Sequence, residues 1–141
     1  MPRHQIFWDR HEELSSTNDL ALARLRDNSP RPFVIVAERQ TAGRGRGGNT
    51  WHTGDGAIAA TLGLTITRDA LPYLSLMTAL TITETLENFQ PPVPSPQSPI
   101  PYTIRWPNDV LFKDKKLAGI LIESPNPTSA AIGFGINTNN T

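Results

Sequence analysis

The 141-residue chain contains no cysteine and carries no net charge, because 13 lysines and arginines balance 13 aspartates and glutamates. The absence of cysteine excludes disulfides and thiolate metal sites, and it agrees with a reducing compartment. The charge balance excludes a global basic field that would draw the protein onto nucleic acid or acidic lipid, so any anion-binding site must be local. No apolar run approaches the ~20 residues of a membrane span, and the amino-terminal segment lacks the apolar core of a signal peptide. We therefore expect a cytoplasmic protein that binds neither nucleic acid nor membrane.

The length favours one domain with a substantial core, since folding at this size buries roughly two-thirds of the unfolded surface. Continuous apolar runs predict buried strands, and the spacing of Leu20, Ala23 and Leu25 predicts a short helix capped by one of the hydroxyl residues before it. The expected helices cover residues 18–26 and 72–89, and the expected strands cover 33–38, 57–66, 102–106, 109–124 (two strands around a charged turn at 113–115) and 130–138. This alternation predicts an α/β or α+β domain with a mixed β-sheet flanked by helices.

Residues 90–101, QPPVPSPQSPIP, form a proline-rich insert. Proline at this density forbids a helix and an interior strand, so an extended, exposed connector is predicted. A ligand for a proline-recognising module is the alternative, but plain spacers of this composition are common.

Residues 39–56, between two predicted strands, are rich in glycine, although a short turn would suffice to join the strands. Arg44 and Arg46 alternate there with glycines, so exposed backbone N–H groups lie beside two guanidinium groups, a combination that suits phosphate or carboxylate. The segment is not a Walker A motif, because it lacks the closing Gly-Lys-Ser/Thr, and it is not a dinucleotide fingerprint, because no helix is expected to follow. A mobile, solvated loop with incidental arginines is the alternative.

Three further segments carry polar or glycine residues at strand ends. RWPND (105–109) places an aromatic ring, a proline and two polar side chains together, although a Pro-Asn-Asp turn beside a core tryptophan would give the same pattern. KDKKLAGILIE (113–123) puts lysines beside a small Ala-Gly pair, where an ordinary charged hairpin is the alternative. GFGIN (133–137) has two glycines inside a strand, which weakens the strand unless something packs on the bare backbone.

Taken together, five motifs resemble, in order and spacing, the catalytic domain of biotin protein ligases, within the biotin and lipoate ligase superfamily. The motifs are STND, AERQTAGRGRGG followed by a tryptophan, RWPNDV, KKLAGILIE and GFGIN, and they cover nearly the whole chain apart from the proline insert. The resemblance implies a class II aminoacyl-tRNA synthetase-like catalytic domain. It also implies a two-step reaction: biotin and ATP give biotinyl-5′-AMP and pyrophosphate, and the adenylate then acylates a lysine of a biotin carboxyl carrier domain.

The first step brings a carboxylate onto the α-phosphate, so the site must supply positive charge and positioning. By resemblance, the catalytic residues are Lys116 and Arg46, and Asp109 lies near Mg²⁺ and the nucleotide. The resemblance assigns biotin to Ser16, Thr17, Gln40, Gly43, Arg44, Lys116, Gly119 and Gly133, and it assigns the nucleotide to Arg46, Trp51, Asn108 and Asn137.

The chain also departs from the family pattern. Arg105 replaces the usual lysine before Trp-Pro-Asn-Asp, and Gly47 and Asn49 make the positive charge of the loop thinner. Family members continue past the last strand into a small β-barrel domain, and some carry an amino-terminal DNA-binding domain, so we expect residues 1–141 to be a partial catalytic domain without either. The alternatives are a lipoyl or octanoyl transferase, which the loop and Trp51 argue against, and a non-catalytic biotin-binding fragment; a homodimer is a further hypothesis.

Overall fold

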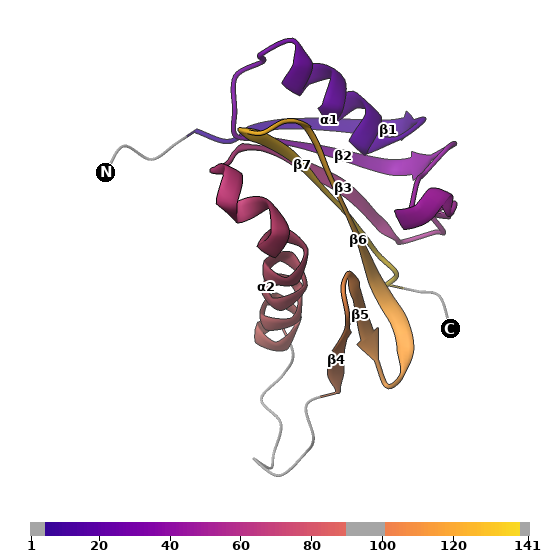
Figure 1. Cartoon of the computed structure of the whole chain (residues 1–141). Helices are drawn as coiled ribbons and strands as arrows, with labels where there is room; N and C mark the ends of the chain where they lie inside the picture. The colour runs from indigo at the N-terminus through magenta and orange to yellow at the C-terminus, as the bar shows by residue number, and fades with distance from the viewer. Residues whose placement is uncertain (1–4, 90–100, 139–141) are drawn as a thin grey trace.

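A computed structural model describes residues 5–89 and 101–138, which form one β-sheet with helices on both faces (Figure 1). The elements are β1 (Phe7–Leu14), α1 (Thr17–Arg26), β2 (Phe33–Gln40), β3 (Ile58–Thr65), α2 (Leu74–Asn88), β4 (Tyr102–Arg105), β5 (Asp109–Phe112), β6 (Lys115–Asn126) and β7 (Ser129–Ile136), with short 3₁₀ helices at Arg46–Gly48 and Arg68–Tyr73. Within the described ranges, none of the helices has the length and apolar character needed to cross a membrane.

The sheet has seven strands in the order β1-β2-β3-β7-β6-β5-β4. β1 and β2 run parallel, and every other neighbouring pair is antiparallel, which confirms the predicted mixed sheet. β7 lies in the middle of the sheet and pairs along its length with both β3 and β6. The glycines of β7 therefore lie in a part of the backbone that is held on both sides.

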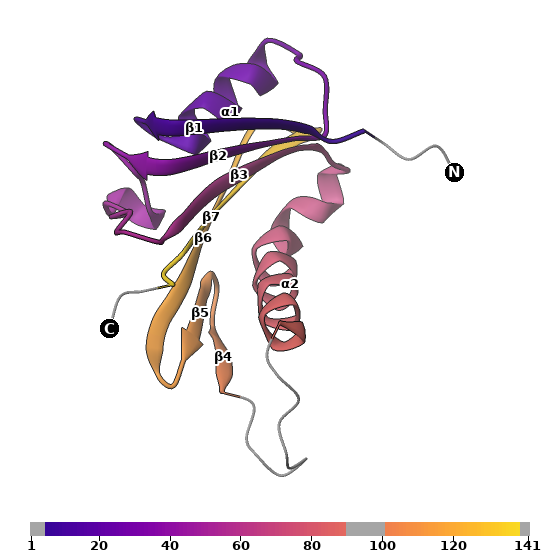
Figure 2. The same ribbon diagram turned by 180° about the vertical axis from the view of Figure 1, so that it is seen from behind.

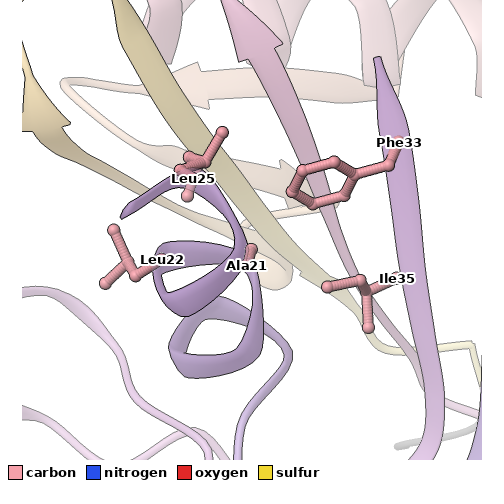
Figure 3. Packing of buried hydrophobic residues seen from close by; sticks show 6 residues of the cluster. Ala21, Leu22, Leu25, Phe33 and Ile35 are labelled. Carbon is pink, nitrogen blue, oxygen red and sulfur yellow. The ribbon is translucent and has the colours of Figure 1, made fainter. Parts of the chain in front are cut away.

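Helix α1 packs on one face of the sheet. Its residues Ala21, Leu22 and Leu25 are buried against Phe33 and Ile35, two side chains of β2 that point toward the helix (Figure 3). The side chains of a strand alternate between faces, so these two residues of β2 define the face that α1 covers.

Helix α2 lies on the opposite face, against the half of the sheet formed by β4 to β7 (Figure 2). Ala131 of β7 belongs to the apolar cluster beneath α1, whereas its neighbours Ala130 and Ile132 pack with Leu74 of α2. Adjacent residues of a strand point to opposite faces, so the two helices lie on different sides of the sheet. The α1 face is the one that carries the candidate site.

The predicted elements are largely confirmed, with two corrections. The sequence did not reveal β1, because half of its eight residues FWDRHEEL are charged and most are exposed at the edge of the sheet, where no apolar alternation is needed. Pro72 lies in the 3₁₀ helix rather than in the first turn of α2, which begins at Leu74. Apart from Pro101, the proline-rich insert at 90–101 lies outside the described residues.

Candidate ligand-binding site

A pocket lies beside the amino-terminal end of α1, between the glycine-rich loop and strands β6 and β7. Ten of the thirteen predicted site residues line it: Ser16, Thr17, Gln40, Arg44, Arg46, Trp51, Asn108, Lys116, Gly119 and Gly133. Gly45 of the glycine-rich loop also lines the pocket. Four further lining residues lie inside the motifs but were not predicted as site residues: Asn18, Ile120, Leu121 and Phe134. The fold thus brings together motifs that are more than 100 residues apart in the chain.

One end of the pocket is a network of neutral polar side chains. The amide oxygen of Gln40 accepts hydrogen bonds from the backbone N–H of Thr17 (2.9 Å) and from its hydroxyl (3.1 Å). The buried hydroxyl of Thr61 lies 2.8 Å from the Thr17 hydroxyl and 2.6 Å from Oδ1 of Asn18. Ser16, one of the three hydroxyl residues that the sequence offered as a cap, caps α1 by accepting a bond from the backbone N–H three residues further on. This network presents hydroxyls and amides that carry no charge themselves.

Arg44 lines the same end, but two carboxylates surround its guanidinium group. Nη1 and Nη2 donate to the two carboxylate oxygens of Glu123 at 2.9 and 2.7 Å, and Nε and Nη2 donate to Oδ1 of Asp19 at 3.0 and 2.7 Å. The Glu123 hydrogen bonds raise the pKa of Arg44. Burial acts to raise the pKa of Glu123, but the bonds from Arg44 and Asn18 outweigh it and lower that pKa. The cluster carries a net charge of −1, so Arg44 does not offer the free positive charge that the sequence suggested.

The other end of the pocket carries positive charge. Lys116 Nζ lies 2.9 Å from Oδ1 of Asp109, and Nε of Arg105 donates to the other carboxylate oxygen at 3.2 Å. Burial acts to raise the pKa of Asp109, but Lys116 and Arg105 outweigh it and lower that pKa. Two cations and one carboxylate leave a net charge of +1. The side chain of Lys116 is 42% exposed, so its ammonium group is accessible from the pocket.

The surroundings of Asp109 do not fit a divalent cation. Both of its carboxylate oxygens face cationic side chains. Within the described ranges, histidine, aspartate and glutamate nowhere form a group of three that could hold a metal ion. Hard cations such as Mg²⁺ are held by several oxygen ligands, so we derive no step through a metal held by this chain.

The glycine-rich loop is a narrow excursion with a tight tip. The backbone N–H of Trp51 donates to the Gly43 carbonyl at 2.9 Å, and the backbones of Arg44 and Thr50 form an isolated antiparallel β-bridge. At the tip Gly47 has φ of 67°, a left-handed conformation that glycine adopts without strain. Arg46 at the tip is exposed and, among the residues that the structure describes, its side chain forms no hydrogen bond or ion pair. It is therefore the loop arginine whose charge is available to a ligand.

Glycines in β6 and β7 form the floor on which Trp51 rests. A Cβ atom on Gly135 would lie 2.2 Å from the Trp51 ring, and one on Gly119 would lie 2.8 Å from it. A Cβ atom on Gly133 would lie 2.0 Å from Oδ1 of Asn18. The sequence allowed two glycines in this strand on the condition that something packs on the bare backbone, and Asn18 and Trp51 meet that condition.

Three predicted residues lie outside the pocket lining: Gly43, Asp109 and Asn137. Gly43 lies behind it, where an added Cβ would meet the Trp51 carbonyl at 2.4 Å. Asp109 lies next to the lining, where its side chain pairs with Lys116 and its backbone is the register partner of Gly119. The backbone N–H of Asn137 bonds to the Leu117 carbonyl at 2.7 Å. The alternative interpretation of RWPND, a turn beside a tryptophan in the core, is wrong in its tryptophan, because Trp106 is 72% exposed.

The two charge clusters predict how stability depends on pH. Asp109 and Glu123 have lowered pKa values in the folded chain, so their ionised carboxylates add to the free energy of unfolding. This contribution is complete above the pKa of the unfolded chain and is lost as the pH falls through the pKa of the folded chain. We expect a nearly constant melting temperature between about pH 7 and 5 and a fall below about pH 4.5. Asp109→Asn should make that fall shallower, which thermal unfolding followed by circular dichroism would test. Equal slopes for the two proteins would contradict the assignment.

Comparisons with known proteins agree with this geometry. Residues 11–139 match the Biotin/lipoate A/B protein ligase family. The chain is 34% identical to the bifunctional ligase/repressor BirA of Bacillus subtilis, over 99% of the chain and 42% of that protein. It is 36% identical to the biotin–[acetyl-CoA-carboxylase] ligase of Mycobacterium tuberculosis, over 89% of the chain and 47% of that protein.

A solved structure gives the same fold. The biotin protein ligase of Aquifex aeolicus in complex with biotin and ATP superposes with a TM-score of 0.74 and 32% identity, over 98% of this chain and 54% of the other. The chain spans about half the length of the relatives that it matches. Because the family match covers most of the residues and the sheet agrees with the solved fold, the chain belongs to the Biotin/lipoate A/B protein ligase family and is similar to the catalytic domain of its biotin protein ligases.

Proposed function

We propose that this chain holds biotin and ATP and supports the formation of biotinyl-5′-AMP. One observation carries the proposal: a single pocket joins an uncharged network of hydroxyls and amides to an accessible lysine and a free arginine. Biotin has the matching polarity, with a neutral ureido ring at one end and a carboxylate at the other. The relatives above support biotin and ATP as the ligands, since one of them was solved with both.

In the proposed orientation, the ureido group exchanges hydrogen bonds with Ser16, Thr17 and Gln40. The net charge of −1 around Arg44 disfavours the carboxylate at that end, because like charges repel strongly in a partly buried site. The carboxylate is then directed toward Lys116. Polar groups that fix one orientation in a largely preformed pocket are the usual basis of small-molecule specificity.

The chemical step would join two anions. A carboxylate oxygen of biotin attacks the α-phosphorus of ATP, the bond to the pyrophosphate oxygen breaks, and pyrophosphate leaves with the bonding electrons. Lys116 lies at the cationic end and would contact both the carboxylate and an α-phosphate oxygen, and Arg46 on the loop tip would hold the phosphate. Fixed positive charge at the place where negative charge concentrates is the form of stabilisation that accelerates such a step.

We further propose that the activated biotin passes to a lysine of a biotin carboxyl carrier domain. The lysine amine attacks the acyl carbon, and AMP leaves with its phosphate oxygen. The name of the Mycobacterium tuberculosis relative supports this acceptor class. Mg²⁺ would accompany the nucleotide as part of the substrate, since Asp109 is paired with two cations.

Thr17→Val tests the biotin end of the pocket. The substitution keeps the shape of the side chain and removes the hydroxyl that contacts Gln40, so we expect biotin to bind about tenfold more weakly, equivalent to ~1.4 kcal/mol. Titration calorimetry with biotin and with lipoate measures the effect. Thr83→Val is the matched control, because its hydroxyl bonds only within α2 on the opposite face.

An assay of pyrophosphate release, read beside the calorimetry, separates the proposal from its alternatives. Pyrophosphate release that depends on biotin and ATP supports a biotin ligase, and release that depends on lipoate would support a lipoyl-transferring enzyme. Biotin binding without pyrophosphate release would support a binding fragment. Equal biotin affinity in Thr17→Val and Thr83→Val would reject the proposed orientation.

A further inference from the structure

The structure assigns Glu123 as a positioning residue that fastens the glycine-rich loop to the sheet and to α1. Glu123 does not line the pocket, yet its carboxylate holds Arg44 at the base of the loop by two hydrogen bonds of 2.9 and 2.7 Å. The same carboxylate accepts a hydrogen bond of 3.0 Å from Asn18 in the first turn of α1. One side chain of β6 thus connects two segments that lie 79 and 105 residues away in the sequence.

The geometry makes Glu123 the stronger of the two partners of Arg44. It offers both oxygens to the guanidinium fork, whereas Asp19 offers only one oxygen. The Glu123 side chain is 26% exposed and that of Asp19 is 50% exposed, so water screens the Glu123 pair less. Bidentate arginine–carboxylate pairs fix orientation as well as adding energy. Loss of Glu123 leaves the Arg44 side chain with one carboxylate partner, the half-exposed Asp19.

The loop has two anchors, and Glu123 supplies one of them. Arg44 lies on the ascending arm, which leads from β2 to the tip of the loop, and is held there by Glu123. Trp51 lies on the descending arm, which leads from the tip toward β3, and its ring lies on the glycine floor of β7. The two arms are joined at their base by the bridge from Arg44 to Thr50. Arg46 lies at the tip between the anchors and has no anchoring contact of its own within the described residues. The position of Arg46 over the pocket therefore depends on both arms.

Hydrogen exchange of the loop amides tests this inference without reference to any reaction. We expect Glu123→Gln to raise the exchange rate of residues 43–50 by about tenfold or more while the exchange of β3 and β7 stays within about twofold, because a local anchor affects local opening. Glu13→Gln is the matched control. It also removes a carboxylate from an ion pair with an arginine, that of Glu13 with Arg39 on β1 and β2.

Two more variants distinguish positioning from general support of the fold. Arg44→Gln should raise loop exchange at least as much as Glu123→Gln, because it also removes the bonds to Asp19. The double variant Arg44→Gln/Glu123→Gln should give the same loop exchange as Arg44→Gln alone, because residues that act as a unit are not additive. Glu123→Asp, which keeps the charge, should restore part of the protection. Unchanged loop exchange in Glu123→Gln would overturn the inference. So would a rise of the same size in the loop and in the sheet, since Glu123 would then only stabilise the fold.

Discussion

Replacement of Lys116 by alanine is expected to slow the formation of biotinyl-AMP by about 100-fold, because loss of one fixed charge or donor at a developing charge typically costs this much. Biotin binding should weaken far less, since the uncharged network at the other end of the pocket stays intact. Such a split between binding and rate identifies an interaction that is stronger in the transition state than in the ground state. Pyrophosphate release in a single turnover and calorimetric titration with biotin measure the two quantities.

Lys115→Ala is the control for this experiment. Lys115 precedes Lys116 on β6, is exposed, and forms no ion pair with any residue that the structure describes. Its removal takes away the same formal charge and should leave the rate unchanged. Equal loss of rate in the two variants would show that Lys116 acts only through the overall charge, and an unchanged rate in Lys116→Ala would remove it from the mechanism.

Asp109 has two opposite effects on Lys116. The carboxylate holds the ammonium group at 2.9 Å and so fixes its position, but it also neutralises part of the charge that a ligand needs. Arg105 relieves this conflict by pairing with the same carboxylate. Arginine at position 105 suits this task, because its fork of N–H donors matches a carboxylate.

The fold was predictable wherever a strand is a continuous apolar run. β2 and β3 are such runs, and the structure confirms both strands to within two residues, although in β2 buried residues alternate with half-buried ones from Phe33 to Ala37. β1 has no such signal, since an edge strand that pairs with one neighbour tolerates charges at most positions. The parallel pairing of β1 with β2 depends on contacts between distant segments and has no local mark in the sequence.

The site was predictable as a set of motifs but not as a set of contacts. The glycines of β6 and β7 correctly indicated close packing on bare backbone, although only the structure identifies Asn18 and Trp51 as the groups that pack there. The environment of Arg44 could not be read from the loop, because its carboxylate partners lie 25 and 79 residues away. In the sequence Arg44 and Arg46 look alike. Only the structure shows that carboxylates neutralise Arg44 and that Arg46 is the one open to a phosphate.

Gly135→Ala is expected to displace the Trp51 ring and detach the descending arm of the loop. The added methyl group would lie 2.2 Å from the ring, and β7 cannot shift to make room because it pairs with β3 on one side and β6 on the other. Forcing extra atoms into a packed site costs about 1–3 kcal/mol. We expect a lower melting temperature, together with a red shift of the tryptophan fluorescence. Trp51 dominates that shift, because Trp8 and Trp106 are already largely exposed.

The double variant Gly135→Ala/Trp51→Ala tests whether this collision is the cause. Without the ring the added methyl group has room, so the second substitution should cost much less in the Gly135→Ala background than in the parent chain. Variants in which the Trp51 ring is displaced or absent should also release biotinyl-AMP faster, because the tip that carries Arg46 is attached to the same arm. Additive losses of stability, or unchanged fluorescence in Gly135→Ala, would show that β7 yields instead of Trp51 and that the glycine floor does not set the position of the loop.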